Sequence, residues 1–176
     1  MTVYYVLDKH VDEALDKQLI TLLGTCFTKP SDVRFKTQRY FNEMPTHRWY
    51  IKDEEGNRVV AHLAVHEKSV FVNQEAIAIS GVAEVCVHPD YRSRGYVKTM
   101  LDHSHQAMQK KGMQYSVLFG RDEVYSSGGY TRVTNLFLMD KSRLTPGTSL
   151  SAMVRSLRPD ARQWPIQRVE LTGLTF

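Results

Sequence analysis

The feature that most constrains the fold is a succession of strand patterns that ends in one helix and one further strand. Between residues 48 and 87, apolar and aromatic strand residues flank turn signals such as Gly56 and Asn57, which indicates consecutive antiparallel strands. Apolar side chains at helical spacing then predict a helix over residues 95 to 111. The compact apolar run at residues 115 to 119 predicts the strand to which this helix crosses. A chain with this order builds a sheet that combines antiparallel neighbours with a crossover connection.

The flanking segments extend the same plan. A strand pattern at residues 3 to 7 precedes apolar residues at helical spacing up to Gly24, and Ser31 indicates the start of a short second helix. After residue 119, a polar segment that ends in glycines predicts a short helix, and residues 130 to 139 predict a strand. We therefore predict an α/β protein of the α+β type, in which helices flank a mixed, mostly antiparallel central sheet.

The length of 176 residues suffices for one domain with a full core. We assign residues 1 to 145 to this domain and residues 146 to 176 to a C-terminal extension packed on it, because the composition turns polar beyond Pro146. Apolar side chains such as Trp164 and a strand pattern at residues 168 to 172 predict a structural role for the extension, as an added strand or as a homodimer contact.

The composition argues against several classes of protein. Hydrophobic residues make up 42% and the formal charge is +4, which fits a globular protein and is too small a charge to indicate nucleic-acid binding. The sequence has no apolar run of membrane-spanning length and no signal-peptide pattern, so we expect a cytoplasmic protein without a membrane partner. The two cysteines lack CxxC spacing, and His62 and His66 are about 13 Å apart along a strand, so we expect no metal site.

The junction at residues 85 to 97 places an apolar strand and two arginines ahead of a glycine and a helix. The first backbone N–H groups of a helix lack partners and attract anions, so they suit a diphosphate. Arg92 and Arg94 add full charges there, and Gly95 allows the backbone to approach a ligand closely. On spacing alone, the same residues are equally consistent with a plain strand-to-helix turn. The sequence contains neither a P-loop nor a GxGxxG pattern.

The segment RSRGYV after VHPDY resembles the Q/R-x-x-G-x-G/A motif of the GCN5-related N-acetyltransferase (GNAT) superfamily, whose members transfer an acyl group from coenzyme A to an amine. The resemblance covers roughly residues 1 to 140 and implies acetyl-coenzyme A as co-substrate. It implies that the pyrophosphate contacts Arg92, Ser93, Arg94, Gly95, Tyr96 and Val97. It also implies that the pantetheine arm meets the backbone of Val85, Cys86 and Val87. Val97 departs from the motif, which has a small residue at this position.

A second match lies in VYSSGGYTRV, where the family has a tyrosine, three residues, a glycine and an aromatic residue. Tyr125, Gly129 and Tyr130 occupy these positions, so the resemblance implies that Tyr125 is the general acid for the departing thiolate. A phenol suits this role because it can donate a hydrogen bond to a developing sulfur anion. The alternative is that the Tyr125 ring packs and its hydroxyl contacts solvent. Leu118 stands where many relatives have asparagine.

The acceptor amine must lose a proton, so the reaction needs a base. Glu84 is the strongest candidate because it is the only charge within the apolar run VAEVCV, where a carboxylate is costly unless it has a partner or a function. The alternative is that Glu84 faces solvent at a splayed strand. Glu123 and His88 are weaker candidates. His88 precedes a proline, and a histidine at such a position is typical of a turn.

The sequence therefore predicts an acetyl-coenzyme A-dependent N-acetyltransferase that acts by direct attack of a primary amine on the thioester. The acceptor stays open among aminoglycosides, polyamines, amino acids and the amines of peptides or proteins. The alternative function is a non-catalytic sensor that binds acyl-coenzyme A.

Overall fold

The computed structural model describes residues 1 to 139, 147 to 160 and 162 to 176. These residues divide into two compact units, which are described separately. The first unit consists of Met1–His66 and Ala83–Ser104, and the second consists of Glu67–Val82 and His105–Phe176. The helices and strands are β1 (Val3–Leu7), α1 (Glu13–Cys26), β2 (His47–Lys52), β3 (Val59–Val72), β4 (Glu75–Val87), α2 (Tyr96–Lys110), β5 (Tyr115–Leu118), α3 (Asp122–Tyr125), β6 (Thr131–Met139), β7 (Thr148–Ser156) and β8 (Val169–Thr172), with short 3-10 helices η1 (Asp8–His10), η2 (Pro30–Lys36), η3 (Pro89–Tyr91) and η4 (Ser126–Gly128).

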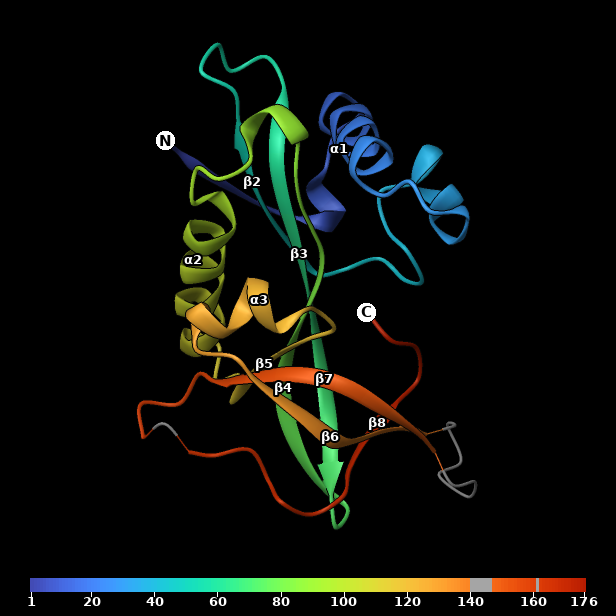
Figure 1. Ribbon diagram of the computed structural model, residues 1–176, viewed down its shortest axis with the longest axis vertical. Helices are drawn as coiled ribbons and strands as arrows, with labels where there is room; N and C mark the ends of the chain where they lie inside the picture. The colour runs from blue at the N-terminus through green and yellow to red at the C-terminus, as the bar shows by residue number, and fades with distance from the viewer. Residues whose placement is uncertain (140–146, 161) are drawn as a thin grey trace. The chain divides into compact units, whose positions relative to one another are not determined.

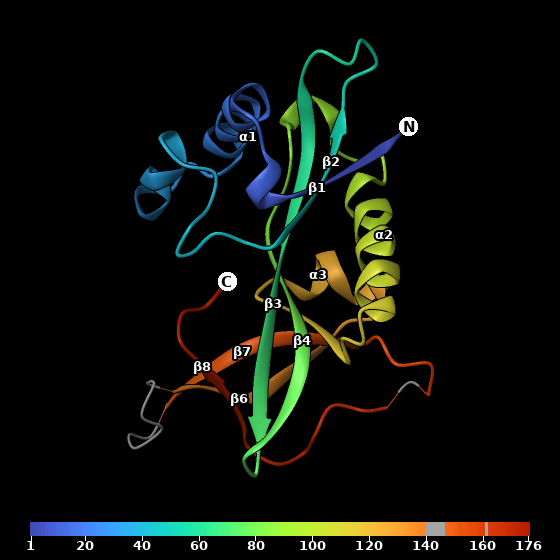
Figure 2. The same cartoon turned by 180° about the vertical axis from the view of Figure 1, so that it is seen from behind.

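The first unit contains β1 and β2 with the first part of β3 and the last part of β4. The order in the sheet is β1-β2-β3-β4, and β1 lies antiparallel beside β2 (Figure 2). The side chain of Asp12 accepts a hydrogen bond from the Leu15 N–H at 2.8 Å, which caps the start of α1. One face of α1 is apolar, and it packs into a core with residues of η2, β3 and β4; the buried members of this core are Leu19, Leu22, Leu23, Phe35, Val59 and Cys86.

Helix α1 runs through Gly24, where the sequence pattern predicted its end, and continues to Cys26. The reason is tertiary packing: a Cβ at Gly24 would lie 3.4 Å from the Phe35 carbonyl oxygen, so the bare Cα lets η2 pack closely against the helix. Figure 1 shows η2 beside α1. The predicted short second helix is thus the 3-10 helix η2.

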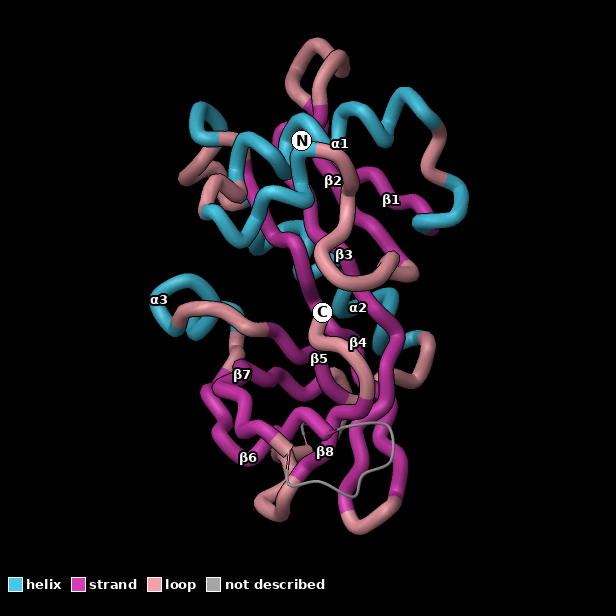
Figure 3. The backbone as a smooth tube through the Cα atoms, turned by 90° about the vertical axis from the view of Figure 1, so that its right-hand side faces the viewer, coloured by secondary structure: helices cyan, strands magenta, loops and turns pink. Residues whose placement is uncertain are grey.

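The second unit contains the rest of β3 and β4 together with β5 to β8, in the order β3-β4-β5-β7-β6-β8 (Figure 3). The pairs β4–β5 and β6–β8 are parallel, whereas β5–β7, β6–β7 and β3–β8 are antiparallel. The prediction of a mixed, mostly antiparallel sheet with flanking helices is therefore confirmed. The buried core of this unit consists of Val70, Ile79, Tyr115, Val117, Leu136, Ala152, Val154, Val169 and Leu171.

Strand β7 was not predicted, yet it lies between β5 and β6 and pairs with both. Ala152 and Val154 point into the core of this unit, and Met153 between them is buried as well, so this stretch of the strand is covered on both faces. The predicted strand at the end of the chain is confirmed as β8. The boundary at residue 145 that we predicted between domain and extension falls outside the described residues, and the division stays a prediction. In the described part of the chain, no helix combines the length and apolar character needed to cross a membrane.

Candidate functional site

The turn between β4 and α2 has an unusual backbone. His88 caps η3 by accepting a hydrogen bond from the Asp90 N–H at 3.3 Å on its Nδ1. Ser93 and Gly95 then have φ angles of 62° and 75°, in the left-handed region that disfavours side chains. A Cβ at Gly95 would meet no atom within 4 Å, so open space lies directly before the first turn of α2. The start of a 15-residue helix, whose first N–H groups have no partner within the helix, therefore lies beside open space.

Two exposed arginines flank this position in the same unit. The Nε of Arg92 donates to the Val87 carbonyl at 3.3 Å, and the Nη2 of Arg94 donates to the Asp90 carbonyl at 3.4 Å. The guanidinium of Arg94 also lies 4.9 Å from the centre of the Tyr91 ring. Cations held against the backbone beside a helix N-terminus give the turn a local positive potential that favours an anion.

The last residues of β4 differ in exposure. Cys86 is buried, whereas Val85 and Val87 are half-buried. The Val87 carbonyl accepts a hydrogen bond from the Cys26 thiol at 3.4 Å in addition to the one from Arg92. Within the first unit, one carbonyl group at the end of β4 therefore contacts both Cys26 of α1 and Arg92 of the turn before α2.

Glu84 occupies an irregular point of β4, with a φ of 55°. Its side chain is only 4% exposed although the residue as a whole is half-buried, so the accessible part of Glu84 is its backbone. The carboxylate accepts hydrogen bonds from the Phe41 N–H at 3.0 Å and from Arg48 Nη1 at 3.1 Å. Burial raises the pKa of Glu84 to about 7, against the lowering effect of Arg48 and Phe41. A carboxyl pKa near neutral pH suits proton exchange with a bound group.

His62 completes the contacts around Glu84. Its Nε2 lies 3.0 Å from Arg48 Nη1 and its Nδ1 lies 3.1 Å from the Glu84 carbonyl oxygen. An arginine can only donate, so Nε2 is the acceptor and Nδ1 carries the proton. Burial, followed by the charge of Arg48, holds the pKa of His62 well below its usual value. His62 is therefore a neutral hydrogen-bonding residue here.

Tyr125 belongs to the second unit, at the end of α3. It is half-buried, and its ring meets the Tyr130 ring edge on with 6.0 Å between the centroids. A Cβ at Gly120 would overlap the Tyr125 ring, so the ring lies directly over this glycine. Tyr130 is buried, and its hydroxyl lies 2.6 Å from Ser116 Oγ. Gly129 has a φ of 80°, which explains the glycine of the second motif.

Glu123 and His88, the weaker base candidates, lie in different units. Glu123 is exposed on α3 of the second unit, and His88 is the half-buried cap of η3 in the first. The role of His88 at a turn agrees with its place before a proline.

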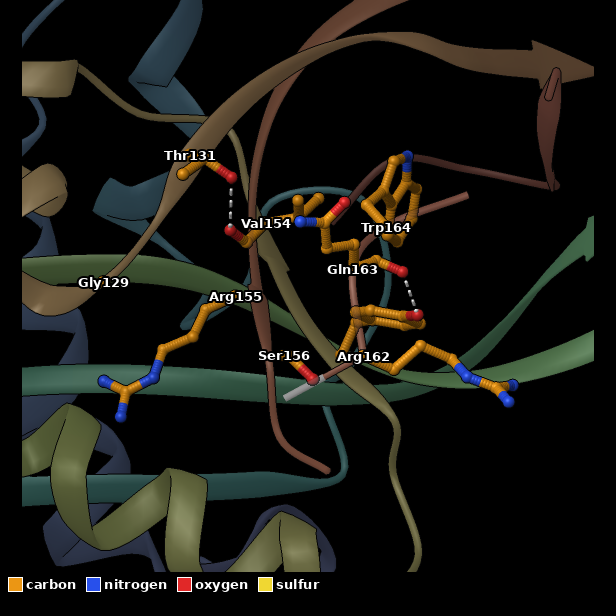
Figure 4. A pocket seen from close by; sticks show the side chains of 9 residues that line it. Gly129, Thr131, Val154, Arg155, Ser156, Arg162, Gln163 and Trp164 are labelled. Carbon is orange, nitrogen blue, oxygen red and sulfur yellow. Dashed lines mark hydrogen bonds between the residues drawn. The ribbon is translucent and has the colours of Figure 1, made fainter. Parts of the chain in front are cut away.

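A cavity of about 360 Å³ in the second unit was not predicted from the sequence (Figure 4). Trp164 packs edge on against Tyr115 in its wall, and the Arg155 guanidinium is directed away from Trp164 and donates to the Gly128 carbonyl at 2.6 Å. The lining residues are Tyr115, Gly129, Thr131, Val154, Arg155, Ser156, Arg162, Gln163 and Trp164.

Arg48, whose side chain is fully buried beside Glu84, was not predicted as a site residue. Its only signal in the sequence is a charge at the edge of the strand pattern RWYIK, after Thr46 and His47, which is weaker than the isolated charge of Glu84. No local pattern connects the two charges, which are 36 positions apart in the chain.

Comparisons with known proteins identify the family and the fold of the chain. The family model described as an acetyltransferase (GNAT) domain matches residues 9 to 133. A GNAT family N-acetyltransferase from Escherichia coli, solved in complex with CoA, is 22% identical with a TM-score of 0.69, and the alignment covers 96% of this chain and 89% of that one. A GNAT family acetyltransferase from Brucella melitensis, solved with acetyl-CoA, is 13% identical with a TM-score of 0.56, covering 74% and 83% of the two chains.

A GCN5-related N-acetyltransferase from Anabaena variabilis is 22% identical with a TM-score of 0.56 over 76% of this chain, which spans only 33% of that longer protein. At these identities the structural matches establish the fold. A comparison with curated protein sequences gave no significant match.

Proposed function

Because the chain belongs to the GNAT acetyltransferase family, we propose that it transfers an acetyl group from acetyl-coenzyme A to the nitrogen of a primary amine. The observation that carries the proposal is the turn before α2, where Arg92, Arg94 and the open backbone at Gly95 surround a position suited to an anion. The coenzyme A and acetyl-coenzyme A complexes of the Escherichia coli and Brucella melitensis proteins support the choice of donor.

The pyrophosphate of the donor binds to the amides and side chains of Arg92, Ser93, Arg94, Gly95, Tyr96 and Val97. A second residue set, Val85, Cys86 and Val87, offers backbone groups to the pantetheine arm. The Val97 side chain is half-buried, so it need not crowd the diphosphate, and its N–H is available whatever the side chain.

Glu84 is the general base in this proposal. The amine nitrogen attacks the thioester carbon, a carbon–nitrogen bond forms and the carbon–sulfur bond breaks. The proton lost by nitrogen passes to the Glu84 carboxylate through water, because this side chain is buried while the backbone beside it is accessible. A backbone N–H of β4 polarises the thioester carbonyl.

Tyr125 is the general acid, and its phenol donates a proton to the departing sulfur. The products are an amide and free coenzyme A, so the proton taken up at Glu84 and the one released from Tyr125 balance. Residues 1 to 145 form the catalytic domain in this proposal, and residues 146 to 176 are its extension and a homodimer contact. The protein acts in the cytoplasm.

The test follows free thiol release from acetyl-coenzyme A with a panel of aminoglycosides, polyamines, amino acids and lysine-containing peptides. We expect turnover with at least one primary amine and none with the N-acetylated form of the same compound. Calorimetry with coenzyme A alone provides a separate measurement of donor binding. Binding without turnover across the panel would favour the sensor, and the absence of binding would refute both functions.

A further inference from the structure

The fully buried guanidinium of Arg48 connects three segments of the first unit. Its Nε donates to Asp8 Oδ1 at 2.6 Å, its Nη1 to Glu84 Oε2 at 3.1 Å and its Nη2 to the Arg39 carbonyl at 2.9 Å. Two carboxylates therefore share one guanidinium, and the shorter contact is the one to Asp8. Attraction between opposite charges strengthens as the distance shortens, so the Arg48 guanidinium stabilises the Asp8 carboxylate more than that of Glu84.

Asp8 is itself bound by two cations. Arg39 donates to its two carboxylate oxygens at 2.9 Å each, and also to Asp16 Oδ1 at 2.7 Å. Burial alone would raise the pKa of Asp8, but the hydrogen bonds from Arg39 and Arg48 outweigh it and lower that pKa. Asp8 is therefore ionised at neutral pH, and it neutralises part of the charge that Glu84 would otherwise face.

The charges of this cluster balance without Glu84. Arg39 and Arg48 carry two positive charges, and Asp8 and Asp16 carry two negative charges. An ionised Glu84 would add a third negative charge in a buried position, and it would share Arg48 with the Asp8 carboxylate. Such a group resists ionisation even though it accepts a hydrogen bond from a cation.

We propose that Asp8 and Arg48 are positioning residues for Glu84: Arg48 orients its carboxyl group, while Asp8 neutralises Arg48 and leaves Glu84 without a counter-ion of its own. The assignment rests on the proposed function, because it concerns the base of that reaction. It explains how a carboxyl group that touches an arginine accepts a proton at neutral pH.

The orientation of Glu84 is fixed at both oxygens, since Oε1 accepts the Phe41 N–H and Oε2 accepts Arg48. The other titratable groups that face it are Asp8, His62 on β3 and Cys86 on β4 itself. His62 is neutral, and the contact of the Cys86 thiol with Cys26, followed by burial, raises the pKa of Cys86, so neither group supplies a counter-charge.

The assignment is tested by the titration of Glu84 in the intact protein, followed by NMR of carboxyl-labelled glutamate, with Glu84→Gln identifying the signal. Asp8→Asn keeps an oxygen acceptor for Arg48 and removes the competing charge, so we expect the Glu84 titration midpoint to fall by at least one pH unit. Arg48→Met removes the cation, and we expect the midpoint to rise by at least one unit. General damage to the fold does not produce shifts of opposite sign.

Asp16→Asn is the matched control, because it removes a carboxylate that contacts Arg39 and not Arg48. The Glu84 titration midpoint should shift less than half as far in Asp16→Asn as in Asp8→Asn. A wild-type midpoint near 4.5, or an Asp8→Asn midpoint that does not fall, would overturn the assignment even if Arg48→Met fails to fold. In a plot of kcat/KM against pH, the acidic limb should move by the same amount as the titration midpoint of Glu84 measured by NMR. If the midpoints shift as expected while the limb stays in place, the assignment holds and the proposed base role of Glu84 is overturned.

Discussion

The hydroxyl of Tyr130 lies 2.7 Å from Nε2 of His105, and both side chains are buried in the second unit. The same hydroxyl lies 2.6 Å from Ser116 Oγ, so a helix and two segments of the sheet region meet at one phenol. Burial raises the pKa of Tyr130 well above its usual value, so the group stays protonated and can donate. The second motif thus supplies a fixed aromatic edge against which the Tyr125 ring packs.

Tyr130→Phe should destabilise the protein because it leaves the buried polar atoms of Ser116 and His105 facing a ring edge. We expect the free energy of unfolding to fall by about 1 to 3 kcal/mol, measured by urea denaturation. Tyr4→Phe, at an exposed position on β1, is the control and should change it by less than about 0.5 kcal/mol. Equal stability of the two variants would show that the Tyr130 hydroxyl contributes nothing to the fold.

Gly120→Ala should reduce turnover more than stability, because the added methyl group would occupy the place of the Tyr125 ring. We expect kcat to fall at least tenfold while the affinity for coenzyme A is retained. Gly128→Ala is the matched control: a Cβ there would meet only the Tyr130 ring, at 3.8 Å, and turnover should be preserved. An unchanged kcat in Gly120→Ala would mean that the position of Tyr125 does not limit the reaction.

Tyr125→Phe removes the phenol and keeps the ring. A general acid typically contributes about 10² to 10⁴-fold, so kcat should fall within this range while coenzyme A binding, measured by calorimetry, stays the same. The same kcat as wild type would assign proton donation to another group. Loss of binding together with turnover would instead indicate that the ring, and not the proton, is required.

The order of the elements could be predicted because each one has a local signal. Hairpin turns such as that at Gly56 and the apolar period of α2 depend on neighbouring residues in the chain. Strand β7 was not predicted because its apolar run, Ala152 to Val154, is only three residues long and lies between polar residues, so its pairing with β5 and β6 decides that it is a strand. The extent of α1 was missed for a related reason, because packing against Phe35 overrides the glycine signal at Gly24.

The residues of the candidate site also fall into two groups: some could be predicted from a local pattern in the sequence, and others depend on the fold. Arg92, Gly95 and Tyr125 stand in short motifs, so their positions could be read from the sequence, although their roles remain proposals. The contact between Asp8 and Arg48 joins residues 40 positions apart, and no local pattern connects them. Glu84 could be singled out as an isolated charge, but its environment depends on partners that only the fold brings together.

Arg92→Ala and Arg94→Ala should each weaken coenzyme A binding, because each removes a cation beside the proposed diphosphate position. We expect the dissociation constant to rise about tenfold, and its dependence on salt to become weaker. Lys98→Ala is the matched control, since Lys98 is an exposed cation of α2 that is paired with Asp102 at 2.8 Å. Turnover of S-acetylpantetheine, which has no diphosphate, should be unaffected in the arginine variants. An equal loss of turnover with acetyl-coenzyme A and with S-acetylpantetheine would contradict the proposed contact between the arginines and the diphosphate.

The titration of Glu84 should be visible in the stability of the protein. Its folded-state pKa of about 7 lies above the ordinary value of 4.5, so between these pH values the folded protein holds a proton that the unfolded chain has released. This contribution to the free energy of unfolding is therefore present in full below pH 4.5 and is lost as the pH rises toward 7. His62 acts in the opposite direction, because its pKa is lowered in the folded state and the unfolded chain binds the proton below its ordinary pKa of 6.5.

The difference between wild type and Glu84→Gln separates the two effects, since His62 is present in both proteins. Relative to wild type, the variant should gain stability as the pH rises from 4.5 to 7, by on the order of 3 kcal/mol at about 1.4 kcal/mol per pKa unit. Urea denaturation at half-unit pH steps measures this difference directly. A difference that does not change with pH would show that Glu84 titrates alike in the folded and unfolded chains, contrary to the raised pKa that its burial gives.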